Sequence, residues 1–203
     1  MAAIQFQGRE KEDEAITGRM TMKECSQESF YSWPLNDYYF MSGVRALSEA
    51  LTTSGCETRY SFVRLDGYSL VSFIEQSPFR HRQNIVIITS RHLIPLASFW
   101  LTENSNICAV FGSTSSVKDV YNGLLNSTPG DKIIQPGVNV EQQLSPSDVR
   151  LLTYFLKGGN VHDLQNKYGN SRSTVTAWRK RILLKFGVRK TCHLFLEKKQ
   201  FTR

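Results

Sequence analysis

A basic helix near the carboxyl end holds the residues of this chain whose types and spacing could do chemistry. At 100° per residue, Val175, Ile182 and Phe186 share one side of the segment 171–186, with Trp178 at its edge, and this side is expected to face a core. The opposite side gathers Ser173, Thr176, Ala177, Lys180 and Leu184, flanked by Arg172 and Arg181. Small residues permit close approach and long basic ones reach base edges or phosphates, so the pattern favours a helix that enters a major groove. A solvent-exposed amphipathic helix without a partner is the alternative.

The residues around that helix predict the elements that position it. Ser145, with Pro146 after it and Asp148 three residues on, begins a helix that ends at Gly158-Gly159. Three further caps are expected to begin helices: Asn160, Ser171 and Thr191. Gly169 ends the second helix, so the second and third helices read as a helix-turn-helix. Residues 144–203 therefore form an all-α four-helix domain.

Positive charge is concentrated in this same part of the chain. Residues 144–203 carry 13 Lys and Arg against 3 Asp and Glu, a net charge of +10, whereas the other 143 residues carry 12 basic and 15 acidic residues. Such a segment attracts polyanions, because each cation placed at a phosphate releases condensed counterions. A solvated basic face with no partner is the other explanation.

The residues that enzymes, metal sites and membrane spans need are scattered or missing. The histidines lie beside no plausible nucleophile or ligand cluster: His81, His92, His162 and His193. The cysteines form no Cys-x-x-Cys pair: Cys25, Cys56, Cys108 and Cys192. The longest strictly aliphatic run is only 85–88, and the first 20 residues lack an apolar core of signal-peptide length. We therefore expect a cytoplasmic protein that is not an enzyme and uses no metal or cofactor.

Residues 30–127 alternate between strand and helix patterns. Strands are expected near 31–35, 60–65, 85–88 and 107–111, and helices near 39–51, 70–74, 95–102 and 117–125. Four alternations predict an α/β domain with a small parallel sheet. The polar residues 1–29 are predicted to be a disordered extension, and residues 128–143 a linker.

The run LSPSDVRLLTYFLKGGNVHDLQNKYGNSRSTVTAWRKRILLKFGVR, residues 144–189, resembles the DNA-binding domain of the LuxR/FixJ family of bacterial transcription regulators. The match includes the opening Leu-Ser-Pro, both helix-ending glycines, the Ser-x-x-Thr-Val that starts at Ser171 and the closing Lys-Phe-Gly-Val-Arg. The resemblance implies base-edge contacts from Thr176, Ala177 and Lys180. It implies phosphate contacts from Arg172, Thr174, Arg181 and Lys185. Trp178 stands where that family usually has histidine, and pairing through the last helix would use Leu194, Phe195 and Leu196.

The segment 36–47 resembles the first strand end and first helix of response-regulator receiver domains. The resemblance implies a vestigial receiver pocket: Asp37 as the remaining metal-binding acid, Asp66 near the phospho-accepting position and Thr89 as the switch threonine. The usual lysine after the last strand is replaced by Gly112-Ser113, and 51–59 is too short for a full second strand and helix. Because phosphoryl transfer needs a bound cation and a positive group, we expect a degenerate receiver-like domain that is not phosphorylated. The alternative is that Asp66 is simply a turn residue before Gly67.

Together the resemblances imply a transcriptional regulator that binds double-stranded promoter DNA as a homodimer or as a heterodimer with a related regulator. The receiver-like domain would serve dimerisation and signal input. Residues 31–40 also resemble enterobacterial regulators of capsule and fimbriae. A ligand-sensing regulator is the alternative, with a small molecule bound among five aromatic residues of the N-terminal domain: Trp33, Tyr38, Tyr39, Phe99 and Trp100.

Overall fold

The protein is described from a computed structural model that places residues 30–78, 81–128, 130–134 and 143–195. The elements run in the order β1 (Tyr31–Trp33), α1 (Tyr38–Thr53), β2 (Ser61–Leu65), α2 (Leu70–Gln76), β3 (Ile85–Thr89), η2 (Arg91–Leu93), α3 (Ile94–Glu103), β4 (Ile107–Gly112), α4 (Val117–Leu125), β5 (Ile133–Ile134), α5 (Pro146–Leu156), α6 (Val161–Tyr168), α7 (Arg172–Lys185) and η4 (Thr191–Phe195). Each strand and helix expected within 30–127 is present. The predicted extension 1–29 lies outside the described residues.

The sheet has the order β1-β2-β3-β4-β5, and every neighbouring pair of strands is parallel. Receiver-type sheets have the order 2-1-3-4-5, in which one more strand lies outside the first. Here residues 54–60 connect α1 directly to β2, and they include no strand. The expectation that this stretch cannot hold a second strand and helix is therefore confirmed, and β1 is an edge strand among the described residues.

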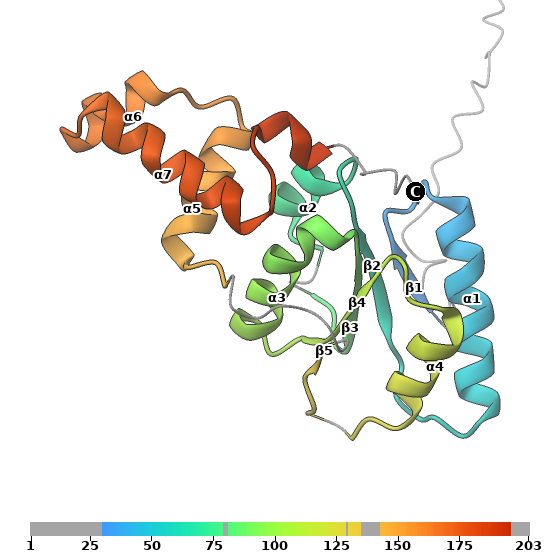
Figure 1. Cartoon of the computed structure of the whole chain (residues 1–203). Coiled ribbons are helices and arrows are strands. Elements are labelled where there is room, and N and C mark those ends of the chain that lie inside the picture. The colour runs from blue at the N-terminus through green and yellow to red at the C-terminus, as the bar shows by residue number, and fades with distance from the viewer. Residues whose placement is uncertain (1–29, 79–80, 129, 135–142, 196–203) are drawn as a thin grey trace, which may run out of the picture.

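Helices cover both faces of the sheet (Figure 1). Helices α1 and α4 pack on one face, where Val44 and Leu124 meet Phe62 and Val86 of the sheet. Helices α2 and α3 pack on the other, against the alternate strand positions such as Ile87. The strand predicted at 85–88 is indeed buried from both sides, as its run of β-branched residues indicates.

The segment predicted to be a linker contributes to the sheet, which corrects that prediction. Ile133 and Ile134 form β5 and pair with Ala109 and Val110 of β4. Beside them, the Lys132 ammonium donates to the carbonyl oxygens of Leu101, Asn104 and Ile107 at 2.9, 2.6 and 2.7 Å. Two consecutive isoleucines were too short a run to indicate a strand, because a two-residue strand has no visible period. Residues 135–142 of the predicted linker lie outside the described residues.

The carboxyl-terminal part consists of α5, α6, α7 and η4, in the places that the caps predict. Ser145 and Asp148 form the expected reciprocal capping box of α5, and Gly169 ends α6 with φ +64°. The fourth helix is corrected to a 3₁₀ helix, Thr191–Phe195, within the described residues. No helix in the described part of the chain is long and apolar enough to cross a membrane.

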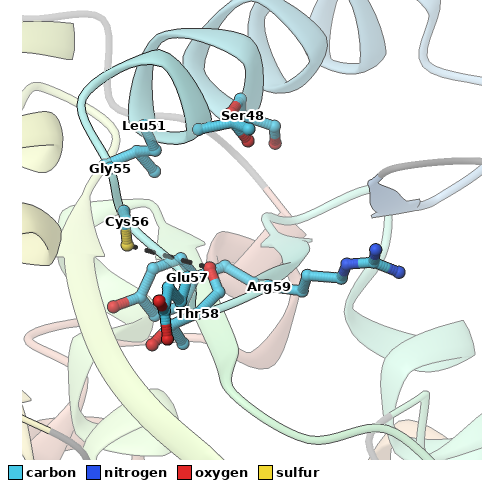
Figure 2. Close-up of a pocket in the computed structure, with 9 residues that line it drawn as sticks. Ser48, Leu51, Gly55, Cys56, Glu57, Thr58 and Arg59 are labelled. Carbon is cyan, nitrogen blue, oxygen red and sulfur yellow. Dashed lines mark hydrogen bonds between the residues drawn. The ribbon is translucent and has the colours of Figure 1, made fainter.

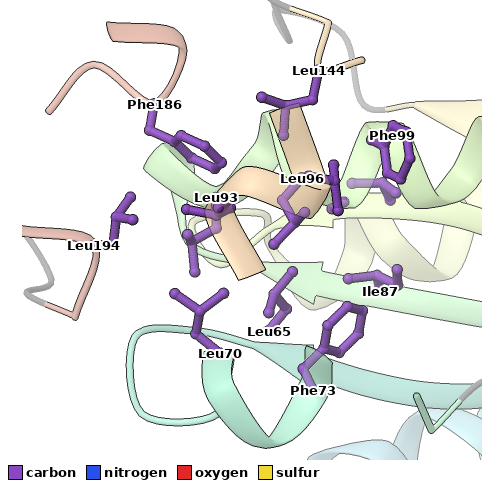
Figure 3. Close-up of a cluster of buried hydrophobic side chains, with 14 of the residues drawn as sticks. Leu65, Leu70, Phe73, Ile87, Leu93, Leu96, Phe99, Leu144, Phe186 and Leu194 are labelled. Atoms are coloured by element: carbon purple, nitrogen blue, oxygen red, sulfur yellow. The ribbon is translucent and has the colours of Figure 1, made fainter. Parts of the chain in front are cut away.

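One apolar core runs through the junction between the α/β domain and the helical part; we call it the junction core. It contains Leu65, Leu70, Leu93 and Leu96 from the α/β domain together with Leu144, Val149, Leu152, Ile182, Phe186 and Leu194 from the helical part. Figure 3 shows Phe186 and Leu194 directed toward Leu93 and Leu70. Helix α3 is apolar on nearly all sides because the sheet covers one side and the helical part covers the other.

Candidate nucleic-acid interface

Helix α7 follows α6 after a three-residue turn, and its start is fixed by hydroxyl groups. The Ser171 hydroxyl accepts a hydrogen bond from the Thr174 amide at 3.2 Å, and it is also bonded to the Ser173 and Thr174 hydroxyls at 2.7 and 2.9 Å. Val175, Ile182 and Phe186 are at most 3% exposed, which confirms the predicted core side. The predicted reading side is therefore turned outward by packing.

The residues expected to contact base edges lie on this outer side. Ala177 and Lys180 are exposed and Thr176 is partly exposed. Leu184, on the same side, is 67% exposed, and Trp178 at the edge is half-buried. The three predicted base-contacting residues thus form one solvent-facing strip on α7, and Arg172 and Ser173 at the amino end of this helix are exposed as well.

The four residues expected to contact phosphates have different surroundings. Arg172 is exposed, and the Thr174 hydroxyl is bonded to that of Ser171. The Arg181 guanidinium donates to Asp148 Oδ1 at 3.1 Å and its side chain remains 59% exposed. The Lys185 ammonium donates to Asp148 Oδ2 and to the Gln143 carbonyl oxygen, both at 2.8 Å. Lys185 therefore has a structural bond to α5, and its phosphate contact stays a prediction.

Asp148 is a buried charged residue of the helical part, with its side chain only 2% exposed. Burial alone raises the pKa of this carboxyl, but hydrogen bonds from Lys185, from the Ser145 amide and hydroxyl and from Arg181 outweigh it and lower the pKa to about 2. The carboxylate therefore stays ionised and fixes α7 against the first turn of α5. This fixed angle sets how the outer side of α7 is presented.

The last described segment does not present a free pairing surface. Arg179 donates through Nε and Nη2 to the Thr191 hydroxyl at 3.2 and 2.8 Å, which fixes the start of η4 to α7. Leu194 is fully buried in the junction core and Phe195 packs against it. The prediction that Leu194 and Phe195 supply a pairing surface is thus not met in this conformation, because the α/β domain already covers Leu194. Leu196 lies outside the described residues.

The three residues of the vestigial receiver pocket come together at the carboxyl edge of the sheet, and Arg64 joins two of them. Its Nη1 donates to Asp37 Oδ2 at 2.5 Å and its Nε donates to Asp66 Oδ2 at 2.8 Å. The remaining carboxylate oxygens accept hydrogen bonds from backbone amides. Asp37 Oδ1 accepts from the Phe40 amide, and Asp66 Oδ1 accepts from the amides of Tyr68 and Ser69. The guanidinium thus supplies between the two acids the positive charge that a divalent cation would supply.

Thr89 and the end of β4 complete the edge. The Thr89 hydroxyl is fully buried and donates to the Leu65 carbonyl oxygen at 2.8 Å. The Ser113 amide, at the position where a receiver has lysine, donates to the Thr89 carbonyl oxygen at 2.7 Å. These bonds join β2 to β3 and β3 to the end of β4. They also mean that the Thr89 hydroxyl is hydrogen-bonded to the backbone.

The aromatic residues of the ligand-sensing alternative do not line a common cavity. Trp33 and Phe99 are in the core, whereas Tyr38 and Tyr39 are 73% and 94% exposed. A pocket of about 460 Å³ lies at the opposite, amino edge of the sheet, between the end of α1 and the start of β2 (Figure 2). Its lining is largely polar, including Ser48, Thr52, Glu57, Thr58 and Arg59. Within the described residues, no group of three or more His, Cys, Asp and Glu could hold a metal ion.

Two features of the site were missed from the sequence, although each leaves a trace in it. Arg64 is the single charged residue in the strand SFVRL, where it stands between the apolar residues Val63 and Leu65, two residues before Asp66. A buried strand keeps such a charge only when an acid lies within reach. The nearly uniform apolar run 93–101 likewise indicated a helix covered on both sides.

The fold and the site define a protein in which a parallel α/β sheet with a receiver-like edge is packed against a basic helical part. Residues 13–127 match the family model of the EcpR N-terminal domain. The chain belongs to this family. It is also 36% identical over 168 residues to the Vi polysaccharide biosynthesis protein TviA of Salmonella typhi, a match that covers 81% of this chain and 93% of the relative.

Solved structures similar to this chain include complexes of the response regulator RcsB. The two-component response regulator RcsB–DNA complex matches with a TM-score of 0.47 and 19% identity, over 82% of this chain and 94% of that chain. RcsB from Salmonella enterica serovar Typhimurium, bound to a promoter with phosphomimetic beryllium fluoride, matches with a TM-score of 0.46 and 18% identity, over 82% and 94% of the two chains.

Proposed function

We propose that this protein is a sequence-specific DNA-binding transcriptional regulator that places α7 in the major groove. The observation that carries the proposal is the solvent-facing strip of Thr176, Ala177 and Lys180, on a capped helix held at a fixed angle by Asp148. A helix of this width fits a major groove, and small residues beside a long cation allow close approach and contact with base edges. The net charge of +10 over residues 144–203 supplies the attraction to phosphates.

Salt dependence tests the DNA-binding part of this proposal. Three charged phosphate contacts per module, from Arg172, Arg181 and Lys185, predict that the logarithm of affinity falls with the logarithm of salt concentration with a slope of roughly −3. Fluorescence anisotropy with a duplex selected from a random-sequence pool measures this slope for the full chain. A slope near zero would show that this surface does not bind DNA, and failure of the selection to enrich any sequence would show that its binding is not sequence-specific.

We further propose that the α/β domain provides dimerisation and signal input without phosphorylation. The support is that Arg64 lies between Asp37 and Asp66 and the Thr89 hydroxyl is bonded to the backbone. A cation held between the acids would have to displace the guanidinium. The assembly on DNA is a homodimer or a heterodimer with a related regulator.

Treatment with a small-molecule phosphodonor and Mg²⁺ is expected to leave the mass of the protein unchanged. The reason is that Asp66 already has its oxygens bonded to Arg64 and to two backbone amides. Intact-protein mass spectrometry provides the measurement. A phosphorylated species that disappears in Asp66→Asn would contradict the proposal, since it would show that the pocket still accepts phosphate.

For the regulated genes, we propose a role in making a surface polysaccharide or fimbriae. The support is the relative TviA, whose name assigns it to Vi polysaccharide biosynthesis. Genome-wide mapping of DNA bound by the protein tests this proposal directly, and binding confined to unrelated genes would refute it.

A further inference from the structure

The α/β domain holds the carboxyl-terminal segment by two contacts, one at Phe195 and one at the carbonyl oxygen of Leu194. At the turn after β2, a Cβ built on Gly67 would lie 2.5 Å from the Phe195 carbonyl oxygen and 2.7 Å from the Phe195 Cα. No side chain fits in that space, so the close approach requires glycine. In η2, His92 Nε2 lies 2.9 Å from the Leu194 carbonyl oxygen. A carbonyl oxygen only accepts, so the imidazole donates from Nε2.

Gly67 belongs to a turn that side-chain bonds hold in place. Asp66 Oδ1 accepts the amides of Tyr68 and Ser69 at 3.0 and 2.9 Å, and the Ser69 hydroxyl donates to the Arg64 carbonyl oxygen at 2.9 Å. The guanidinium of Arg64 in turn holds the other oxygen of Asp66. Asp66 of the vestigial receiver pocket, together with Arg64 and Ser69, therefore positions the glycine against which Phe195 lies.

We propose that these contacts form a latch in which Arg64 and Asp66 hold the turn 66–69, and the turn and His92 hold Leu194 and Phe195 against the α/β domain. A permanent internal ion pair, rather than a transferable phosphoryl group, then sets the closed position. A signal that moves the turn releases η4, and the exposed side chain of Tyr68, next to Gly67, lies where a binding partner can act on it.

The latch controls how the helical part is placed and paired. Thr176, Ala177 and Lys180 remain accessible when the latch is closed, whereas Leu194 is fully buried. In the closed position, one helical part can therefore still contact DNA, but Leu194 is not available to pair with a second copy of the chain. This consequence rests on the proposed function, but the latch itself can be measured without DNA.

Hydrogen–deuterium exchange of the full chain tests the latch through the segment 191–195. Gly67→Ala is expected to raise the exchange of this segment at least about tenfold, because its methyl group pushes Phe195 away. Gly43→Ala is the matched control: a Cβ there has no atom within 4 Å, so exchange is expected to stay at the parent value. Arg64→Gln is expected to raise exchange in the same direction, since it removes the ion pair that holds Asp66 Oδ2 and so loosens the turn.

Equal exchange in Gly67→Ala and the parent would overturn the latch, as would an equal rise in Gly43→Ala. If Gly67→Ala raises the exchange of 191–195 and Arg64→Gln does not, the role assigned to Arg64 is overturned. Exchange of β3 amides shows whether the α/β core stays folded. If Gly67→Ala unfolds this core, His92→Ala, which removes the hydrogen bond to the Leu194 carbonyl oxygen, decides in its place. If exchange responds as expected and neither parent nor variant binds DNA, the latch stands and the proposed function fails.

Discussion

Asp148→Asn is expected to lower the free energy of unfolding by roughly 2–3 kcal/mol. Asparagine keeps the shape of the side chain but removes the negative charge that Arg181 and Lys185 face. The loss is smaller than the ~3–5 kcal/mol typical of a fully buried ion pair, because the Arg181 and Lys185 side chains are 59% and 26% exposed and can turn to water. Urea denaturation followed by circular dichroism measures the change.

Asp119→Asn is the matched control. Asp119 has the same place in a capping box as Asp148, with Ser116 as its partner, but it is exposed in α4. Its replacement is expected to cost less than about 1 kcal/mol, the ordinary value of a cap. Equal losses in the two variants would show that the cations contribute nothing beyond the capping box.

The same carboxyl gives stability a pH dependence of known sign. Its folded-state pKa of about 2 lies below the ordinary value of 3.8, so its contribution is complete above about pH 4 and is lost as the pH falls toward 2. The contribution is roughly 2 kcal/mol. In Asp148→Asn this part of the acid dependence is expected to disappear, and acid titrations of the two proteins that ran parallel would contradict the assignment.

Lys180→Ala is expected to reduce discrimination between a selected duplex and a scrambled one by roughly 5- to 150-fold, which corresponds to ~1–3 kcal/mol for a lysine that contacts a base edge. The physical reason is that Lys180 is the one long cation in the solvent-facing strip of Thr176, Ala177 and Lys180. Affinity for the scrambled duplex should change much less. Anisotropy titrations with both duplexes at one fixed salt concentration measure the ratio.

Lys118→Ala provides the control for charge alone. Lys118 is exposed on α4 in the α/β domain, away from α7, and its removal lowers the net charge by the same amount. Discrimination should then match that of the parent. If Lys180→Ala also matched the parent, α7 would not be the helix that reads bases.

The fold was predictable where the sequence pattern has a clear period or a cap. The run 85–88 indicated a strand buried on both faces, and Ser145, Asn160 and Ser171 marked three helix starts to the residue. β5 was not predictable, because two isoleucines carry no period and form a strand only when β4 offers its edge. The fourth helix was predicted from Thr191 alone, and this residue does not distinguish the start of an α-helix from that of a 3₁₀ helix.

The candidate site, like the fold, was predictable from the sequence only in part. Thr176, Ala177 and Lys180 lie opposite the core side of their helix. Their outward direction could therefore be deduced from the sequence at 100° per residue. The bonds of Arg181 and Lys185 to Asp148 depend on how α5 crosses α7, and the contact of Phe195 with Gly67 depends on how two domains dock. Local sequence does not encode such distances between segments, since they are set by packing.

The junction core makes the two halves of the chain depend on one another structurally. Here Leu93 and Leu194 lie in one continuous apolar interior, and Gly67 accepts the backbone of Phe195. A substitution on one side therefore has to be matched on the other. Removing the helical part would therefore uncover apolar side chains of the α/β part, such as Leu70 and Leu93, which it now covers.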